Sequence, residues 1–148
     1  PIIKIGNWIG PLLVDAAIKK VKTVILLGYH GKLIKLAGGI FHTHNHLADG
    51  RIEILVYLAV KENIPPQVIL KLTQLNTLED ALLLLERFNK SISEKLFHNL
   101  SNTIEKRSFA YVNRYVKTDM EIALIIFDRK RKIRWAGIYG NKYISYFQ

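Results

Sequence analysis

The side chains best suited to chemistry are concentrated in residues 28–53, which read GYHGKLIKLAGGIFHTHNHLADGRIE. The stretch holds four of the five histidines of the chain and ends in Asp49, Arg51 and Glu53. Imidazole titrates near neutral pH without help, so His30 and His44 are candidates for moving a proton. Carboxylate and guanidinium groups can bind the charged parts of a ligand. The stretch therefore predicts a binding or catalytic site.

Two glycine-bearing turns belong to the same prediction: residues 6–10 (GNWIG) and residues 28–32 (GYHGK). Each is expected to follow a β-strand, and in a parallel sheet both would lie at the carboxyl-terminal edge, where ligands bind. Glycine lets a ligand approach the backbone, and free N–H groups at the next helix start favour anionic or polar groups. Alternatively, these glycines are ordinary loop residues with no role in binding a ligand. The glycine spacing fits neither a P-loop nor a dinucleotide-binding fingerprint.

The charged side chains of the stretch have both functional and structural interpretations. Lys32 and Lys35 lie one helical turn apart and could clamp a pair of carboxylates, or they could form a solvated helix face. Asp49 and Glu53 are expected four residues apart on one helix face, an arrangement of like charges that is mildly destabilising. The helix N-terminus would offset part of this repulsion. Arg51 is expected to point elsewhere and to pair with another partner.

His42, His44 and His46 alternate, so on an extended segment they would share one face, as metal ligands often do. No carboxylate stands in register with them, the chain has no cysteine, and the HExxH pattern of zinc peptidases is absent. We therefore expect polar or substrate-facing histidines and no resident metal. A metal-dependent hydrolase built on the three histidines is retained as an alternative function.

The pattern of apolar residues predicts the elements that must position these side chains. Strands are expected over 2–5, 23–27, 121–127 and 132–139, and helices over 12–20, 33–37, 47–62, 66–73, 78–88 and 91–106, the last with a capping box of Ser91 and Glu94. Residues 109–116 fit either a strand or a helix. The fold class is α/β: a small mixed sheet of about four or five strands, with a parallel βαβ start and an antiparallel C-terminal hairpin, covered by helices.

The length of 148 residues predicts a single α/β domain over residues 1–148. The absence of cysteine indicates a reducing compartment, and we expect a cytoplasmic protein without a membrane partner, since no apolar run is long enough to span a bilayer. The chain begins with an apolar run and without methionine. We therefore expect it to be part of a longer polypeptide.

The net charge of +10 attracts a polyanion, either nucleic acid or a small molecule with many carboxylates. Residues 129–132 read RKRK and are followed by Arg134, Trp135 and Tyr139, which could bind RNA through charge and stacking. A charged hairpin tip is the simpler explanation. A basic nucleic-acid-binding module without catalysis is the principal alternative function.

The chain resembles the CbiD family, the cobalt-precorrin-5B C(1)-methyltransferases of anaerobic cobalamin synthesis. The motifs that carry the resemblance are GNWIG at 6–10, GYHGKLIKLAG at 28–38, Phe41, Thr43-His44, Ala48-Asp49, and Arg51 with Glu53. The resemblance is dense from Ile3 to about Leu58 and thinner beyond. The sequence looks like the carboxyl-terminal portion of the longer family chain, whose N-terminal half would be its partner.

The resemblance implies methyl transfer from S-adenosylmethionine, as co-substrate, to C-1 of cobalt-precorrin-5B, giving cobalt-precorrin-6A. Cobalt enters only as part of this anionic tetrapyrrole, and only modest affinity for nucleic acid is expected. The implied catalytic residues are His30, His44 and Asp49; the donor-binding residues are Gly6, Asn7, Gly10, Gly28, Gly31 and Glu53; the substrate-binding residues are Lys32, Lys35, Thr43 and Arg51.

Overall fold

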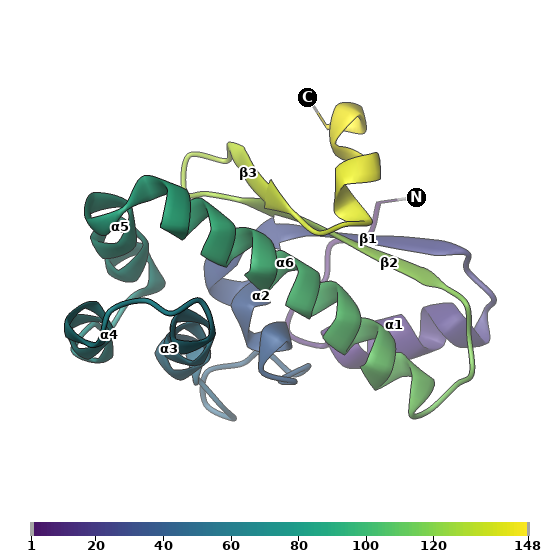
Figure 1. The fold of residues 1–148 in the computed structure, drawn as a ribbon. Helices are drawn as coiled ribbons and strands as arrows, with labels where there is room; N and C mark the ends of the chain where they lie inside the picture. Colours follow the sequence, from purple (N-terminus) through teal and green to yellow (C-terminus); the bar gives the residue numbers. More distant parts are fainter. Residues whose placement is uncertain (1, 148) are drawn as a thin grey trace.

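The computed structural model describes residues 2–147, which form helices, a small sheet and two short 3₁₀ turns (Figure 1). In chain order the elements are α1 (Ile9–Ile18), β1 (Thr23–Tyr29), α2 (His30–Ala37), α3 (Arg51–Lys61), α4 (Pro66–Thr73), α5 (Leu78–Phe88), α6 (Lys90–Asn113), β2 (Glu121–Phe127), β3 (Ile133–Ala136), η1 (Gly140–Lys142) and η2 (Ile144–Tyr146).

The sheet has the order β1-β2-β3, which confirms the mixed α/β class. β1 and β2 run parallel, in register from Thr23 opposite Glu121 to Tyr29 opposite Phe127. β2 and β3 are antiparallel, which confirms the C-terminal hairpin, with an irregularity at Phe127. The parallel connection between β1 and β2 runs through helices α2 to α6, as a parallel pair requires a long crossover.

The strand predicted over residues 2–5 is wrong. These residues have no strand structure, and the side chains of Ile2 and Ile3 are 99% and 66% exposed. The parallel partner of β1 is therefore β2, and within residues 2–147 the sheet has three strands rather than four or five. An apolar run forms a β-strand only where a neighbouring strand pairs with its backbone N–H and C=O groups. The local sequence pattern does not show whether such a neighbouring strand is present.

The helices cover one face of the sheet, and η1 and η2 lie on the other (Figure 1). β2 is buried on both faces, with Ile122, Leu124 and Ile126 in the main core. β1 is an edge strand whose Leu27 is 44% exposed, so it is not buried on both faces as β2 is. Among residues 2–147, none of the helices combines the length and the apolar run that a bilayer crossing needs.

Several elements follow directly from local signals. α4, α5 and β2 have the predicted bounds, and Thr77 caps α5 by accepting the backbone N–H of Asp80. α1 begins three residues earlier than expected, so Pro11 lies within its first turn, where its missing N–H costs no helical bond. α3 begins at Arg51 rather than at residue 47, because Gly50 adopts the left-handed conformation (φ 62°).

α6 differs from its prediction at both ends. Its cap is Asn89, whose side chain accepts the backbone N–H of Ile92, and not the predicted capping box of Ser91 and Glu94. The Glu94 carboxylate instead accepts a hydrogen bond from Arg134 on β3. The helix continues to Asn113, which resolves residues 109–116 mainly as helix.

A buried carboxylate joins α6 to the sheet. Glu105 is 3% exposed, and its Oε1 accepts the backbone N–H groups of Leu124 (3.0 Å) and Gly140 (2.8 Å), while its Oε2 accepts that of Tyr139 (3.1 Å). Position 137 is glycine because a Cβ atom there would collide with this carboxyl group. Glu105 therefore fixes the chain after β3 against both β2 and α6.

We expect Glu105→Gln to lower the free energy of unfolding of the full-length protein by roughly 2–4 kcal/mol, because a neutral amide accepts hydrogen bonds less strongly and places a donor against the Tyr139 N–H. Denaturant unfolding followed by circular dichroism measures the loss. The exposed neighbour Lys106→Gln should change stability by less than about 0.5 kcal/mol. Equal effects of the two substitutions would contradict the role of Glu105.

Candidate functional site

The carboxyl ends of β1 and β2 meet at one edge of the sheet, because the two strands run parallel. The chain leaves β1 directly into α2 at His30, and it leaves β2 into a turn that begins at Asp128. Such an edge is where α/β proteins bind ligands. The second glycine-bearing turn lies here, as expected, whereas the first follows no strand.

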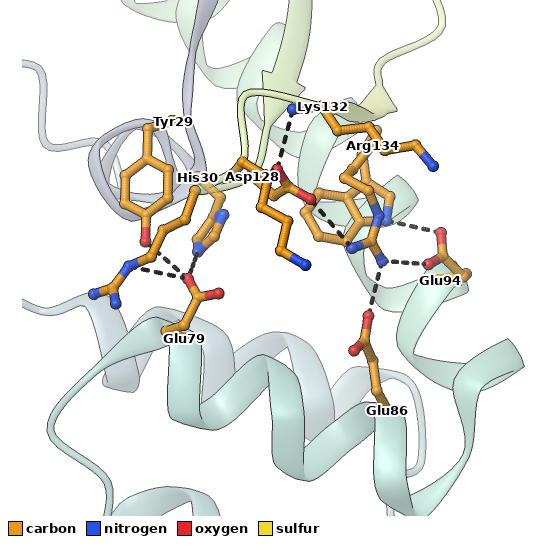
Figure 2. Close-up of polar contacts among 11 residues, drawn as sticks. Tyr29, His30, Glu79, Glu86, Glu94, Asp128, Lys132 and Arg134 are labelled. Atoms are coloured by element: carbon orange, nitrogen blue, oxygen red, sulfur yellow. Dashed lines mark hydrogen bonds and ion pairs between the residues drawn. The ribbon is translucent and has the colours of Figure 1, made fainter.

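Three side chains converge on one oxygen of Glu79 at this edge (Figure 2). Tyr29 donates its hydroxyl to Oε2 (2.9 Å), His30 Nε2 lies 3.2 Å from the same atom, and Arg129 Nε lies 3.6 Å from it. Glu79 stands in the first turn of α5, where the helix dipole favours a negative charge. The sequence gives no local signal for Glu79, because its partner Tyr29 lies 50 residues away.

His30 is fully buried, with the rings of Phe97 and Trp135 edge-on at 6.4 and 6.2 Å between centroids. Neither of its ring nitrogens has a well-aligned hydrogen-bond partner within residues 2–147. Burial lowers the pKa of His30, and the nearby Glu79 carboxylate opposes this shift without reversing it. The imidazole is therefore held neutral at pH 7 beside the Glu79 carboxylate.

Two of the five basic side chains of the hairpin, Arg129 and Arg134, are bound to carboxylates (Figure 2). Arg134 Nη2 donates to Glu86 (2.8 Å) and Glu94 (3.1 Å), and the indole Nε1 of Trp135 donates to Glu94 (2.8 Å). The Trp135 ring is 1% exposed and stacks on Phe97, so it offers no face to a nucleobase. Trp135 therefore cannot stack on an RNA base, as the nucleic-acid-binding hypothesis expected.

Lys35 holds the loop that follows α2. The side chain is 1% exposed, and its Nζ donates to the carbonyl oxygens of Thr43 (3.0 Å) and Ala48 (2.8 Å) and to Oδ1 of Asn45 (2.6 Å). Burial lowers the pKa of Lys35, whereas the charge of Asp49 raises it. All three donors of the ammonium group are used by the loop, which gives Lys35 a positioning role.

The N-terminal segment lies against the same helix and loop. Lys32 Nζ donates to the carbonyl oxygen of Gly6 (2.6 Å), and the backbone N–H of Thr43 donates to the carbonyl oxygen of Asn7 (3.0 Å). The side chains of Thr43 and Asn7 also share a hydrogen bond (3.1 Å). The predicted residues Gly6, Asn7, Lys32 and Thr43 are thus brought together.

The three alternating histidines do not share one face. His42 packs edge-on against Trp8, with 4.4 Å between ring centroids, whereas His44 and His46 stack on each other at 4.9 Å in the exposed part of the loop. Within residues 2–147 no group of three potential metal ligands comes together. His44 is the exposed imidazole among the predicted catalytic residues, and His30 is the buried one.

Two expectations about the acidic helix start are wrong. Arg51 does not have a separate partner: its Nε and Nη2 bind the two oxygens of Asp49 at 2.6 and 2.9 Å. Asp49 and Glu53 do not share a helix face, because Asp49 precedes Gly50 and lies outside α3. The Arg51 guanidinium lowers the pKa of Asp49, which therefore carries a negative charge at neutral pH.

At three of the four glycines predicted to bind the donor, other side chains of the protein occupy the space beside the Cα atom. An added Cβ atom would lie within 3.0 Å of another side chain at Gly10 (Tyr111), Gly28 (Leu33) and Gly31 (Tyr29). At Gly6 it would meet nothing within 4 Å. Close packing explains Gly10, Gly28 and Gly31, and Gly6 is the member of the set that leaves open space.

The predicted site residues form two groups joined by α2. His30 opens the helix and belongs with Glu79 at the sheet edge, whereas Thr43, His44 and Asp49 belong to the loop that Lys35 holds. No hydrogen bond or ion pair within residues 2–147 connects His30 to His44 or Asp49. Glu53 belongs to neither group and faces a pocket between helices.

The family model and the similar proteins found for this chain all point to the same family. Residues 42–137 match the family described as CbiD, C-terminal domain. The whole chain is 84% identical to a cobalt-precorrin-5B C(1)-methyltransferase of Prochlorococcus marinus (strain MIT 9215) and 72% identical to that of subsp. pastoris (strain CCMP1986 / NIES-2087 / MED4), spanning 40% of the length of each. Over 98% of the chain, identity to the protein of strain MIT 9303 is 49%, spanning 38% of its length. No solved structure gives a significant match.

The buried His30 predicts a loss of stability in acid. Its folded pKa lies below the value of about 6.5 expected for the unfolded chain, so between these two values only the unfolded state takes up the proton. The contribution is complete above about pH 6.5 and declines as the pH falls towards the folded pKa. In the full-length protein His30→Gln should reduce the loss of unfolding free energy between pH 7 and pH 5, measured by urea titration, while the exposed His98→Gln should not.

The bonds of Lys35 predict a stability cost for its removal. Lys35→Met keeps the aliphatic length but leaves the carbonyl groups of Thr43 and Ala48 without their donor, and we expect a loss of about 3 kcal/mol together with faster hydrogen exchange in residues 43–48. Lys32→Met, which removes one bond to Gly6, is the matched control and should cost less than about 1 kcal/mol. Similar costs for both would contradict the holding role of Lys35.

Proposed function

The chain belongs to the CbiD family, and from this membership we propose that the full-length protein is a cobalt-precorrin-5B C(1)-methyltransferase of cobalamin biosynthesis. It would transfer the methyl group of S-adenosylmethionine to C-1 of the macrocycle and give cobalt-precorrin-6A. We further propose that this portion, which spans 40% of the relatives' length, is a single α/β domain that acts together with the remainder of the polypeptide.

The observation that carries the proposal is the loop of residues 42–51. It begins the stretch that matches the family, it is fixed by the buried Lys35, and it leaves His44 and Asp49 exposed. A fixed backbone with exposed titratable groups is the arrangement that catalysis by positioning requires.

The substrate carries many acetate and propionate groups, and basic side chains are suited to bind them. We propose Lys32 and Arg51 for this contact, since both lie beside the loop and Arg51 retains guanidinium N–H groups beyond those bound to Asp49. Lys35 and Thr43 would contribute by holding the loop, and the open space at Gly6 next to Asn7 would admit part of a ligand.

Methyl transfer is an in-line displacement. The bond from sulfur to the methyl carbon breaks with its electron pair moving to sulfur, while π electrons of the macrocycle form the new bond from C-1 to the methyl carbon. Alignment of the two substrates and exclusion of water supply much of the rate. We propose His44 as the base for any proton that the macrocycle releases and Asp49 as the charge that stabilises the cationic state, with His30 and Glu79 as a proton-accepting pair behind the sheet edge.

This proposal predicts the behaviour of loop variants in the full-length enzyme. His44→Ala and Asp49→Asn should each lower turnover by roughly 100-fold, because one removes a proton acceptor and the other a fixed charge. The assay follows methyl transfer from labelled donor to cobalt-precorrin-5B. His46→Ala, which alters the neighbouring imidazole of the same loop, serves as the control and should retain most of the activity. Full turnover by both His44→Ala and Asp49→Asn would show that the loop does not carry the chemistry.

A further inference from the structure

A pocket outside both groups of site residues lies between the end of α2, one face of α3 and the middle of α6. Its volume is about 440 Å³, within the range of small-molecule pockets of roughly 300–1,000 Å³. The residues that line it are Ala37, Gly38, Glu53, Ile54, Tyr57, Leu58 and Arg107. The α3 members recur at the spacing of one helix face, so the pocket has an apolar wall with a single carboxylate at one end.

The two charged residues of the pocket are opposite in sign and not bound to each other. Within residues 2–147 neither Glu53 nor Arg107 takes part in an ion pair or a side-chain hydrogen bond, although both are exposed. The Arg107 guanidinium lies over the turn after α2, since a Cβ atom at Gly39 would be 3.7 Å from its Nη1. The pocket therefore offers one free anionic and one free cationic group.

The aromatic ring of the pocket is accessible to a cation. Tyr57 is 58% exposed, and Nζ of Lys61, one turn further along α3, lies 5.5 Å from its ring centroid. Such contacts between a cation and an aromatic face are favourable in partly solvated sites. A ligand cation or a flat heterocycle can take the place of Lys61 on this ring.

We propose that this pocket binds the amino-acid end of the methyl donor, an inference that rests on the methyltransferase function proposed above. Arg107 would bind the α-carboxylate and Glu53 the positively charged ammonium group, with the thioether or sulfonium portion along Ile54 and Tyr57. The macrocycle is a poorer fit, because its many carboxylates would face the like charge of Glu53. The pocket thereby separates the zwitterionic donor from the polyanionic acceptor.

Calorimetry on the full-length protein tests this assignment with two probes. S-adenosylhomocysteine carries the amino-acid end, and 5′-methylthioadenosine lacks it. Glu53→Gln and Arg107→Gln should each weaken S-adenosylhomocysteine binding by about tenfold or more, the effect of losing one charge-assisted hydrogen bond. Both variants should bind 5′-methylthioadenosine with unchanged affinity, since that probe makes neither contact.

Matched controls change exposed charges outside the pocket: Lys106→Gln on α6 and Asp119→Asn in the loop before β2. Both should bind the two probes like the wild type. The assignment is overturned if Glu53→Gln and Arg107→Gln bind S-adenosylhomocysteine normally, if they weaken both probes equally, or if they raise only the KM for the macrocycle. Failure of the wild type to bind S-adenosylhomocysteine and to transfer methyl groups would instead remove the proposed function itself.

Discussion

A charged side chain that leaves water must find hydrogen-bond partners within the protein, and this constraint organises both the fold and the loop. Glu105 meets it by accepting three backbone N–H groups from β2 and from the chain after β3. Lys35 meets it by donating to three oxygen atoms of the loop after α2. Because each buried charge binds three groups of another segment, each determines where that segment can lie. The carboxylate fixes the sheet, and the ammonium group fixes the candidate site.

Ion pairs remove part of the basic character that the composition suggests. At the sheet edge Arg129 faces Glu79, and Arg134 lies between Glu86 and Glu94. Two of the five basic side chains in residues 129–134 are therefore neutralised, and the adjoining Trp135 is buried. The remaining positive charge is spread over the helices and loops, and it includes Lys130, Arg131 and Lys132, for which no ion pair is found within residues 2–147.

The sequence predicts what depends on near neighbours and fails where a distant partner decides. α4, α5 and β2 follow from periodicity and from caps such as Thr77, and residues 28–53 do contain the loop with exposed histidines. The strand over residues 2–5 fails because its expected partner, β1, pairs with β2 instead. Glu79 was missed for the same reason. Glu105 had a signal, since it stands four residues after the buried Ser101 on the core-facing side of α6, where a charged residue must have buried partners.

Glycines and free charges carry different information about ligands. Gly10, Gly28 and Gly31 permit close contacts within the chain, so a glycine-rich stretch after a strand is explained here mainly by packing. Exposed charges without a partner are common on protein surfaces, so Glu53 and Arg107 are informative only because both line one pocket. Glu53 and Arg107 line the same pocket without binding each other, which leaves one charge of each sign at its wall. If the proposed function holds, the unpaired charges of this pocket, rather than the density of glycines, would distinguish a zwitterionic donor from a polyanionic acceptor.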